Sequence, residues 1–308
     1  MMYYEDLMGK NAIATIKVSK ELLKYSVGER IPTVSEFVDS LSLARGTVQN
    51  AIKTLVDHEA VRIESKGHLG SYLMKKNMRV LLKFAGVRML LGTMPLPYSR
   101  RYEGLASGLI ASMENNYDLP INLAYMRGSV NRISMVLQKR YDFAVVSRYA
   151  AHHFLEKYPD KIEIVVGFGA GSYLSNHVIM FHNPNIKEIQ DGMKIGIDSA
   201  SIDQKELTKF VCQGKNVEFI EIEYSRIIER VISGDIDATV MNIDEANDKH
   251  VKIHTKSIPQ VNKDNTEAVL VVAKENEIST LIKELVDVET VLNIQRLVLE
   301  EKDRKSVV

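Results

Sequence analysis

Cysteine is almost absent from this sequence, and its only copy is Cys212. One thiol cannot form an internal disulfide, and it cannot supply a zinc site built from cysteine ligands. The chain also has no excess of charge, because 40 Lys and Arg balance 40 Asp and Glu. A strongly basic surface over the whole protein is therefore excluded, so any nucleic-acid site must be a local patch.

Long apolar runs are missing as well. No window reaches the roughly 18 uninterrupted apolar residues that a membrane-spanning helix requires. The N-terminal stretch, MMYYEDLMGK, has no apolar core of the kind found in secretory signals. We therefore expect a cytoplasmic protein without membrane contact. A chain of 308 residues with 45% hydrophobic and 26% charged residues is long enough for about two globular domains.

The first of these domains is expected at residues 1–77, where helical periodicity dominates. Thr33 and Glu36 have the spacing of a capping box, which predicts the start of a helix. The next helical stretch, SLARGTVQNAIKTL, carries its apolar residues at i, i+3, i+4, i+7 and i+8, which predicts a single buried stripe. That stripe consists of Val48, Ala51, Ile52, Leu55 and Val56.

The opposite face of this helix is polar. Its first turn contains Arg-Gly-Thr, which is unusual for a helix that serves only to pack. Arginine can neutralise a phosphate or read guanine, Gln and Asn can read adenine edges, and a glycine lets the backbone approach a duplex. A strand at 60–65, a Gly-bounded turn at 66–70 and a strand at 71–74 follow, so a wing can contact the adjacent groove. The predicted DNA-contacting residues are Thr33, Arg45, Gly46, Thr47, Gln49, Asn50, Lys53, Lys66 and Gly67.

The order and spacing of these features resemble the DNA-binding domain of GntR-type bacterial transcription regulators. The matching positions are Gly28, Pro32, Glu36, Arg45, Thr47, Val48, Ala51, Leu55 and Gly67. The resemblance implies a winged helix-turn-helix that binds double-stranded DNA. Two positions depart from the pattern. Ala44 stands where a Ser usually caps the recognition helix, and Gln49 stands where Arg is frequent.

Residues 78–308 alternate strand-like apolar runs with helical stretches, which predicts an α/β domain with a parallel sheet. In such sheets, ligands bind at the carboxyl ends of the strands. The predicted strands are 87–92, 121–126, 141–146, 162–169, 178–181, 193–197, 217–222, 237–242 and 267–273. The predicted helices are 102–115, 131–139, 203–212, 225–233 and one from Ser279 onward.

Two phrases within this domain are similar to each other, LQKRYDFAVV at 137–146 and ISGDIDATV at 232–240. Both resemble a helix-to-strand step of two-lobed, type-2 periplasmic-binding-protein-like domains. With the winged helix in front, the chain resembles the YhfZ-type regulator family. The resemblance implies two lobes that face each other across a cleft, with lobe one at about 78–147 and 246–308 and lobe two at about 148–245.

The cleft is expected to bind a small-molecule effector. Three arginines at strand ends, Arg100, Arg127 and Arg148, indicate an anionic ligand, because guanidinium pairs with carboxylate or phosphate. The predicted effector residues from lobe one are Ser99, Arg100, Tyr102, Arg127, Ser129, Ser147 and Arg148, and those from lobe two are Ser172, Tyr173, Asp198, Ser199, Asn242 and Asp244.

An enzyme or a solute-binding protein acting in the same cleft is the alternative. The glycine loop GFGAGS at 167–172 lacks the spacing of a dinucleotide site, and a strand rather than a helix follows it. The histidine pairs 152/153 and 250/254 come without a carboxylate cluster, so we expect no metal, and we expect no cofactor. The preferred interpretation is a dimeric, ligand-responsive regulator that binds a palindromic operator and is not an enzyme.

Overall fold

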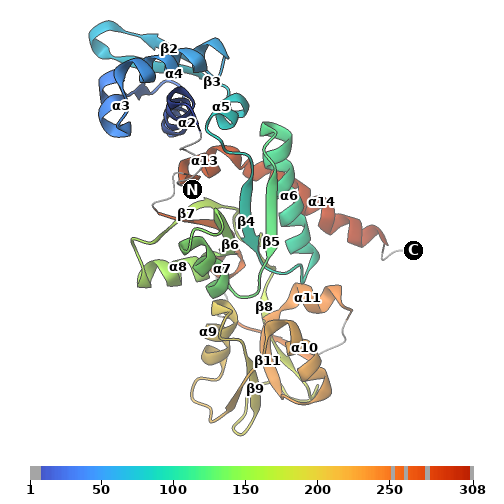
Figure 1. The fold of residues 1–308 in the computed structure, drawn as a ribbon. Coiled ribbons are helices and arrows are strands. Elements are labelled where there is room, and N and C mark those ends of the chain that lie inside the picture. Colours follow the sequence, from blue (N-terminus) through green and yellow to red (C-terminus); the bar gives the residue numbers. More distant parts are fainter. Residues whose placement is uncertain (1–7, 251–253, 260–262, 275–277, 306–308) are drawn as a thin grey trace. The chain divides into compact units, whose positions relative to one another are not determined.

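The computed structural model describes residues 8–250, 254–259, 263–274 and 278–305 (Figure 1). The chain divides into two compact units, residues 1–90 with 113–120 and residues 91–112 with 121–308. The sequence placed this division at residue 77. The difference arises because helix α5 (Met78–Phe84), which the sequence did not predict, groups with the first unit. The Asn77 side chain accepts a hydrogen bond from the Val80 amide and so begins α5 directly after a strand.

The first unit has the element order of a winged helix-turn-helix. Helices α2 (Lys10–Leu23), α3 (Val34–Leu41) and α4 (Arg45–Asp57) precede a hairpin of β2 (Val61–Ser65) and β3 (Ser71–Lys76). The short strand β1 (Arg30–Ile31) pairs with β3, so the sheet order is β1-β3-β2 and both pairings are antiparallel. A single turn of 3-10 helix, η1 (Gly67–Leu69), forms the tip of the hairpin.

The apolar stripe of α4 is narrower than the sequence predicted. Val48, Ala51 and Leu55 are buried, but Ile52 is half-buried and Val56 is 42% exposed. Helix α4 packs against α2 and α3 and against one strand, β2, so a stripe three residues wide is enough to hold it. The rest of its circumference remains open to solvent.

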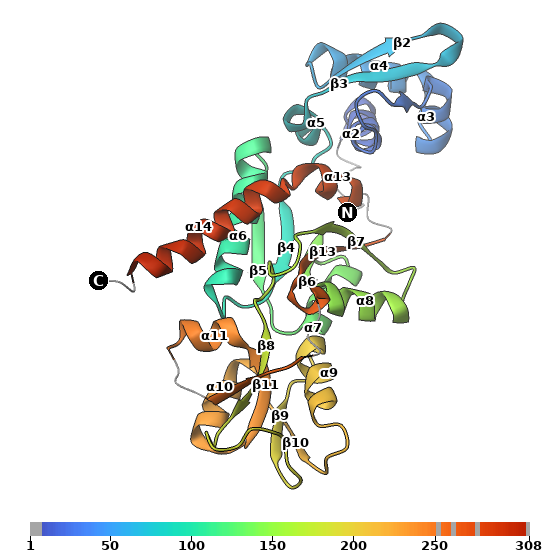
Figure 2. The ribbon, with the colours of Figure 1, turned by 180° about the vertical axis from the view of Figure 1, so that it is seen from behind.

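The second unit contains two lobes, each built on a five-stranded sheet (Figure 2). The sheet of lobe one has the order β5-β4-β6-β13-β7, with β4 and β6 parallel and β13 antiparallel to both of its neighbours. Its strands are β4 (Leu90–Met94), β5 (Ile121–Tyr125), β6 (Phe143–Ser147), β7 (Ile162–Gly167) and β13 (Ala268–Ala273). Its helices are α6 (Arg100–Tyr117), α7 (Ser129–Leu137), α8 (Arg148–Lys157), α13 (Ile278–Leu285) and α14 (Val288–Lys305).

Lobe two has the sheet order β10-β9-β11-β8-β12. Its strands are β8 (His177–Phe181), β9 (Lys194–Ile197), β10 (Glu218–Glu221), β11 (Ala238–Asn242) and β12 (His254–Ser257). Its helices are α9 (Ile202–Val211), α10 (Tyr224–Ser233) and α11 (Ile243–Asp248). The predicted fold class, a winged helix followed by a two-lobed α/β domain, is confirmed.

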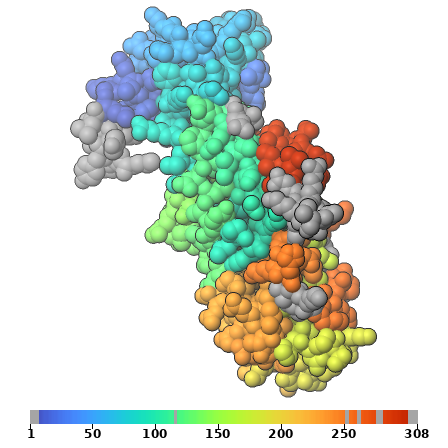
Figure 3. Space-filling view, turned by 90° about the vertical axis from the view of Figure 1, so that its right-hand side faces the viewer, coloured from blue at the N-terminus to red at the C-terminus, as the bar shows by residue number. Residues whose placement is uncertain are grey.

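The limits of the lobes differ from the sequence prediction. Strand β7 was assigned to lobe two but pairs with β13 of lobe one, and β12 was assigned to lobe one but pairs with β8 of lobe two. The reason is that the chain crosses between the lobes twice, once between β7 and β8 and once between β12 and β13. The short helix α12 (Lys263–Thr266) lies on the second crossing. In Figure 3 the orange segment of α11 lies directly against the green surface of lobe one.

Candidate functional site

The start of the helix-turn-helix is fixed by a capping box. The Thr33 hydroxyl accepts a hydrogen bond from the Glu36 amide at 3.3 Å, and the Glu36 carboxylate accepts one from the Thr33 amide at 2.6 Å. These hydrogen bonds lower the pKa of Glu36 below its ordinary value. Thr33 therefore acts first as a helix cap, and its hydroxyl proton is still available as a donor.

Helix α4 presents most of the predicted DNA-contacting residues to solvent. Arg45, Gly46, Gln49, Asn50 and Lys53 are exposed, and Thr47 beside them is half-buried. The Arg45 guanidinium donates to the Ser35 hydroxyl at 3.1 Å, which holds it along the start of α3. A side chain added at Gly46 would meet no atom within 4 Å, so the start of α4 is open to approach.

The tip of the hairpin is exposed and carries the predicted cation. Lys66 lies with its Nζ 4.7 Å from the centroid of the Tyr72 ring, which orients the ammonium group. Gly67 has a φ of +60°, a left-handed conformation that favours glycine. Leu69, which follows in the same turn, is 54% exposed.

A second candidate site lies between the two lobes of the second unit, where a cavity of about 50 Å³ is partly open to solvent. Five of the predicted effector residues line it, namely Tyr102, Arg127, Ser129, Tyr173 and Asn242. The other lining residues, which the sequence did not single out, are Pro95, Tyr98, Gly128, Arg132, Leu174, His177, Ser201, Asp203 and Tyr224.

The lobes are in close contact around this cavity. The Val130 amide donates to the Ala200 carbonyl at 3.3 Å, and the Ile202 amide donates to the Ser129 hydroxyl at 3.4 Å. Gly128, with a φ of +75°, approaches Ala200 so closely that an added Cβ would lie 2.7 Å from its carbonyl oxygen. The lobes therefore touch beside the cavity, and glycine at position 128 is what allows the approach.

Two of the three predicted ligand-binding arginines have other roles. Arg148 makes two hydrogen bonds to the Glu267 carboxylate, at 2.6 and 2.7 Å, which raises the pKa of Arg148 and lowers that of Glu267. The Arg100 guanidinium donates to the Val298 carbonyl at 2.8 Å. Arg127 alone of the three lines the cavity, and it pairs with Glu223 at 2.7 Å. The arginines therefore do not converge on one ligand group.

The remaining predicted effector residues support the backbone around the cleft. The Asp198 carboxylate accepts from the amides of Tyr224 and Ala200, and Ser199 bonds to Glu221 through its amide and hydroxyl, both at 2.8 Å. The Ser172 hydroxyl accepts from the Ala268 amide. Ser147 caps α8 by accepting from the Ala150 amide, and Ser99 is buried outside the cavity lining.

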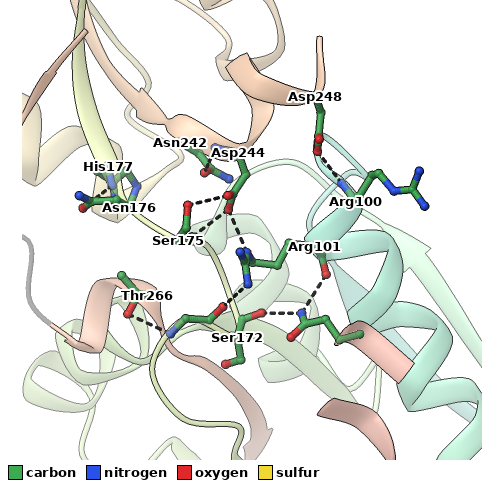
Figure 4. Close-up of polar contacts among 12 residues, drawn as sticks. Arg100, Arg101, Ser172, Ser175, Asn176, His177, Asn242, Asp244, Asp248 and Thr266 are labelled. Carbon is green, nitrogen blue, oxygen red and sulfur yellow. Dashed lines mark hydrogen bonds and ion pairs between the residues drawn. The ribbon is translucent and has the colours of Figure 1, made fainter. Parts of the chain in front are cut away.

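Asp244 belongs to a contact between the lobes that the sequence did not predict (Figure 4). The Arg101 Nε atom, on α6 of lobe one, donates to Asp244 at 3.0 Å on α11 of lobe two. The same carboxylate accepts from the amide and hydroxyl of Ser175, at 2.8 and 2.5 Å. Arg101 also donates to the Gly171 carbonyl at 2.7 Å, so it joins α6, α11 and the first crossing.

Helix α14 contacts the same region. Gln295, only 4% exposed, donates to the carbonyls of Arg101 and Ser172, at 2.9 and 2.8 Å. The Arg100 amide donates to Asp248 of α11 at 2.8 Å. The N-terminal turn of α6 is therefore held both by lobe two and by the C-terminal helix.

The most informative cavity residues that the sequence analysis missed are Arg132 and Asp203. Arg132 is 3% exposed and donates only to neutral acceptors, the carbonyls of Val145 and Met126 and the Tyr173 hydroxyl, at 2.8 to 3.0 Å. Because Arg132 lies inside a helix rather than at a strand end, a rule based on strand ends could not find it. A charged residue within the otherwise apolar stripe of α7 was the available signal.

Asp203 on α9 of lobe two is 6% exposed. Its two carboxylate oxygens accept from the Ser147 hydroxyl at 2.5 Å and from the Asn265 amide group at 2.8 Å. Burial raises the pKa of Asp203 to about 6 despite these hydrogen bonds and the nearby Arg132 guanidinium. The carboxylate is therefore mostly ionised at neutral pH.

The histidine and the tyrosines of the cavity are neutral. Burial lowers the pKa of His177 to about 4 and raises that of Tyr98 to about 12, and it raises the pKa of Tyr102 and Tyr224 well above the ordinary value. Two ring pairs, Tyr98 with Tyr224 and Tyr102 with Tyr173, have centroids 5.3 and 5.1 Å apart. Both pairs join residues from different parts of the chain in the wall of the cavity.

The glycine loop and the histidine pairs considered in the sequence analysis do not line the cavity between the lobes. The glycine loop at 167–172 forms the first crossing, and a strand follows it, as expected. His152 contacts Asp264 at 3.1 Å, and His254 lies on β12 beside the Phe181 ring. Within the described residues, no group of three or more His, Cys, Asp or Glu side chains is arranged to hold a metal ion. None of the helices among those residues is both long and apolar enough to cross a membrane.

Comparison with known proteins identifies both parts of the chain. The family model of the YhfZ C-terminal domain matches residues 77–306, and a helix-turn-helix domain model matches residues 26–73. The protein YhfZ of Escherichia coli K12 is 32% identical over 234 residues, which are 76% of this chain and 75% of that protein.

A solved structure extends the comparison. The crystal structure of YhfZ from Shigella flexneri is similar with a TM-score of 0.60 and 29% identity, over 73% of this chain and 96% of that one. The match to the C-terminal domain model spans both lobes and therefore includes every residue of the inter-lobe cavity. The chain carries a helix-turn-helix domain and belongs to the YhfZ family.

Proposed function

We propose that this protein is a transcription regulator that binds DNA through its winged helix and responds to a small molecule bound between its lobes. The observation that carries the DNA-binding part is helix α4. One side of α4 is packed firmly by Val48, Ala51 and Leu55, while the other presents two cations, two carboxamides and a glycine to solvent. This division suits a helix that enters the major groove.

The hairpin supplies a second contact. Lys66 at its exposed tip can neutralise a phosphate beside the groove that α4 occupies. As in GntR-type regulators, we propose that two copies of the chain bind a palindromic operator, with half-sites about one helical turn apart. The sensing unit then acts by changing the spacing or orientation of the two winged helices.

The effector is proposed to occupy the cavity between the lobes. Arg127 and Arg132 line it, and the Asn242 side-chain nitrogen is buried there without a hydrogen-bond partner. These donors favour a ligand with an anionic group. The cavity contains no paired acid and base of the kind used for proton transfer, so the protein is proposed to bind this ligand without converting it.

The test is selection of genomic DNA fragments by the purified full-length protein at modest salt. An enriched palindromic sequence is expected. Lys53→Ala should lower affinity for all bound sequences alike and reduce the slope of log K against log salt by about one, because one phosphate contact is lost. Lys209→Ala, an exposed lysine of lobe two, is the matched control and should leave both quantities unchanged. The absence of any enriched palindrome would sink the proposal.

A further inference from the structure

The inter-lobe cavity carries two buried charges of opposite sign that do not pair with each other. Arg132 comes from lobe one and Asp203 from lobe two, and both line the cavity. They are 3% and 6% exposed. No ion pair joins them, although both belong to the described part of the chain. Buried charges normally pair, because an isolated ion loses its hydration without compensation.

Both groups retain hydrogen-bonding capacity. A guanidinium has five N–H donors, and Arg132 uses three of them on Val145, Met126 and Tyr173. A carboxylate can accept about four hydrogen bonds, and Asp203 accepts one on each oxygen from side chains. Each pole is therefore held in position by the protein and can still receive one more partner.

The charges of the lining balance without any ligand. Arg127 is paired with Glu223, and the charges of Arg132 and Asp203 are equal and opposite. His177 is neutral because burial lowers its pKa. A ligand with a net negative charge would leave an uncompensated charge in a buried space, whereas a ligand with one positive and one negative group would not.

The volume of the cavity favours a small ligand. A volume of about 50 Å³ holds roughly four waters. A ligand that replaces them has about five to seven non-hydrogen atoms. The four tyrosine rings on the walls suit a small aliphatic body and can stabilise an ammonium group through their faces.

From these observations we propose that the effector is a small zwitterion, an amino acid with little or no side chain. Its carboxylate binds Arg132 with the help of Tyr173 and Asn242, and its ammonium group binds Asp203. The inference rests on the proposed function in that it uses the same cavity, and it adds a cationic group to the ligand with an anionic group proposed there. Because the poles come from different lobes, the zwitterion joins the lobes.

The experiment is binding to the purified full-length protein, measured by calorimetry and by thermal shift. The probes are glycine, L-alanine and L-serine, with acetate and propionate lacking the ammonium group, methylamine and ethylamine lacking the carboxylate, and inorganic phosphate. At least one of the zwitterions is expected to bind and to raise Tm, at least tenfold more tightly than either of its one-pole analogues.

The decisive variant is Asp203→Asn, which keeps the shape and the contacts to Ser147 and Asn265, since a hydroxyl can turn to accept. It should weaken the zwitterion at least tenfold while leaving acetate unchanged, so that the ratio of the two affinities falls toward one. Glu206→Gln, on the same helix outside the cavity, is the matched control. Arg132→Lys should weaken zwitterion and acetate together. Circular dichroism establishes that the Arg132→Lys variant folds.

Acetate binding as tightly as glycine, or phosphate binding more tightly than either, would overturn the zwitterion and leave a sensor of anions. Failure of all three amino acids to bind would overturn it as well. Neither result touches the DNA-binding proposal, because operator selection is measured without these probes. Loss of operator binding with intact amino acid binding would instead remove the regulator and keep the zwitterion site.

Discussion

At the scale of single residues, neighbours decide what a charged side chain can do. Arg148 and Arg132 are both arginines of lobe one. Arg148 is neutralised by Glu267, whereas Arg132 donates only to neutral oxygens, so only the second offers a charge to a ligand. Asp203 offers the opposite charge from the other lobe. Burial disfavours the charged form of this carboxylate and therefore raises its pKa.

The first prediction concerns Asp203. In the folded protein its pKa is about 6, above the ordinary 3.8. Folding therefore favours the protonated form, and the stability that this contributes is present below pH 4 and is lost as the pH rises through 6. The loss is about 3 kcal/mol. Relative to the wild type, Asp203→Asn should become more stable by about this amount between pH 4 and 7, measured by urea unfolding. A pH-independent difference would contradict the assignment.

The second prediction concerns His177 and has the opposite sign. Its pKa in the folded protein is about 4, below the ordinary 6.5. The unfolded chain binds a proton that the folded chain excludes, so stability falls as the pH drops from 6.5 toward 4. The unfolding free energy should fall by about 2 kcal/mol between pH 7 and 5 through this group alone. His177→Gln should abolish this decrease in unfolding free energy, whereas His153→Gln, at an exposed site, should leave it unchanged.

At the scale of elements, helix α4 shows a conflict between stability and access. Ala44 is its N-cap residue and provides no side-chain hydrogen bond, whereas Thr33 caps α3 fully. The amides of the first turn of α4 are consequently free of a side-chain cap at the place where a phosphate is expected. The exposed Gly46 leaves that turn open to a duplex.

The third prediction follows from this missing cap. Ala44→Ser should stabilise the winged helix by about 1 kcal/mol, because a hydroxyl at this position can accept from the N2 or N3 amide. Urea unfolding measures the gain, and operator choice should not change. Ala44→Val is the control, since it adds volume without an acceptor. A gain of equal size in both variants would attribute the effect to packing.

The fourth prediction separates base recognition from phosphate binding on helix α4. Gln49 is exposed and carries a carboxamide that can pair with adenine. Gln49→Ala should change the preferred base at one or two operator positions, at about 1–3 kcal/mol per contact, without changing the salt dependence. Selection from randomised operators compares it with Lys53→Ala. Identical preferences in wild type and Gln49→Ala would remove this residue from base recognition.

At the scale of the whole molecule, the two lobes contact each other around the cavity and at helix α11. There the Arg101–Asp244 pair ties α6 to α11, and Arg101 also ties α6 to the first crossing. These two side chains are 19% and 14% exposed, so the pair is screened less by water than a surface pair. The contact between the lobes therefore has a source of stability within the chain itself.

The fifth prediction tests this contact. Asp244→Asn removes the charge that holds Arg101 and should shift the lobes toward an open arrangement. Loss of one partly buried partner costs about 1–3 kcal/mol, which lowers effector affinity roughly fivefold or more. Hydrogen exchange of the Ser175 amide, which donates to Asp244, should accelerate in parallel. Lys209→Ala, at an exposed site of lobe two, is the comparison. Unchanged hydrogen exchange at Ser175 would show that the Arg101–Asp244 pair does not hold the lobes together.

Much of the fold could be predicted because local patterns report local structure. The capping box at Thr33, the helix at 45–57 and the hairpin around Gly67 follow from periodicity and turn residues. The lobe limits could not be predicted, because which sheet accepts β7 or β12 depends on pairing between strands distant in sequence. For the same reason Arg148 was placed in the cleft and Arg132 was overlooked.

The sequence by itself determined the classes of structure present in this protein. Helical and strand periods and the order of elements specify a winged helix followed by an α/β domain, because each period is set by neighbours along the chain. Only the tertiary structure decided which charged residues line the same cavity. Arg132 and Asp203 are 71 positions apart. They line one cavity because two chain crossings bring the lobes together. Because both side chains are buried, their charges interact more strongly with a neighbouring group than exposed charges do.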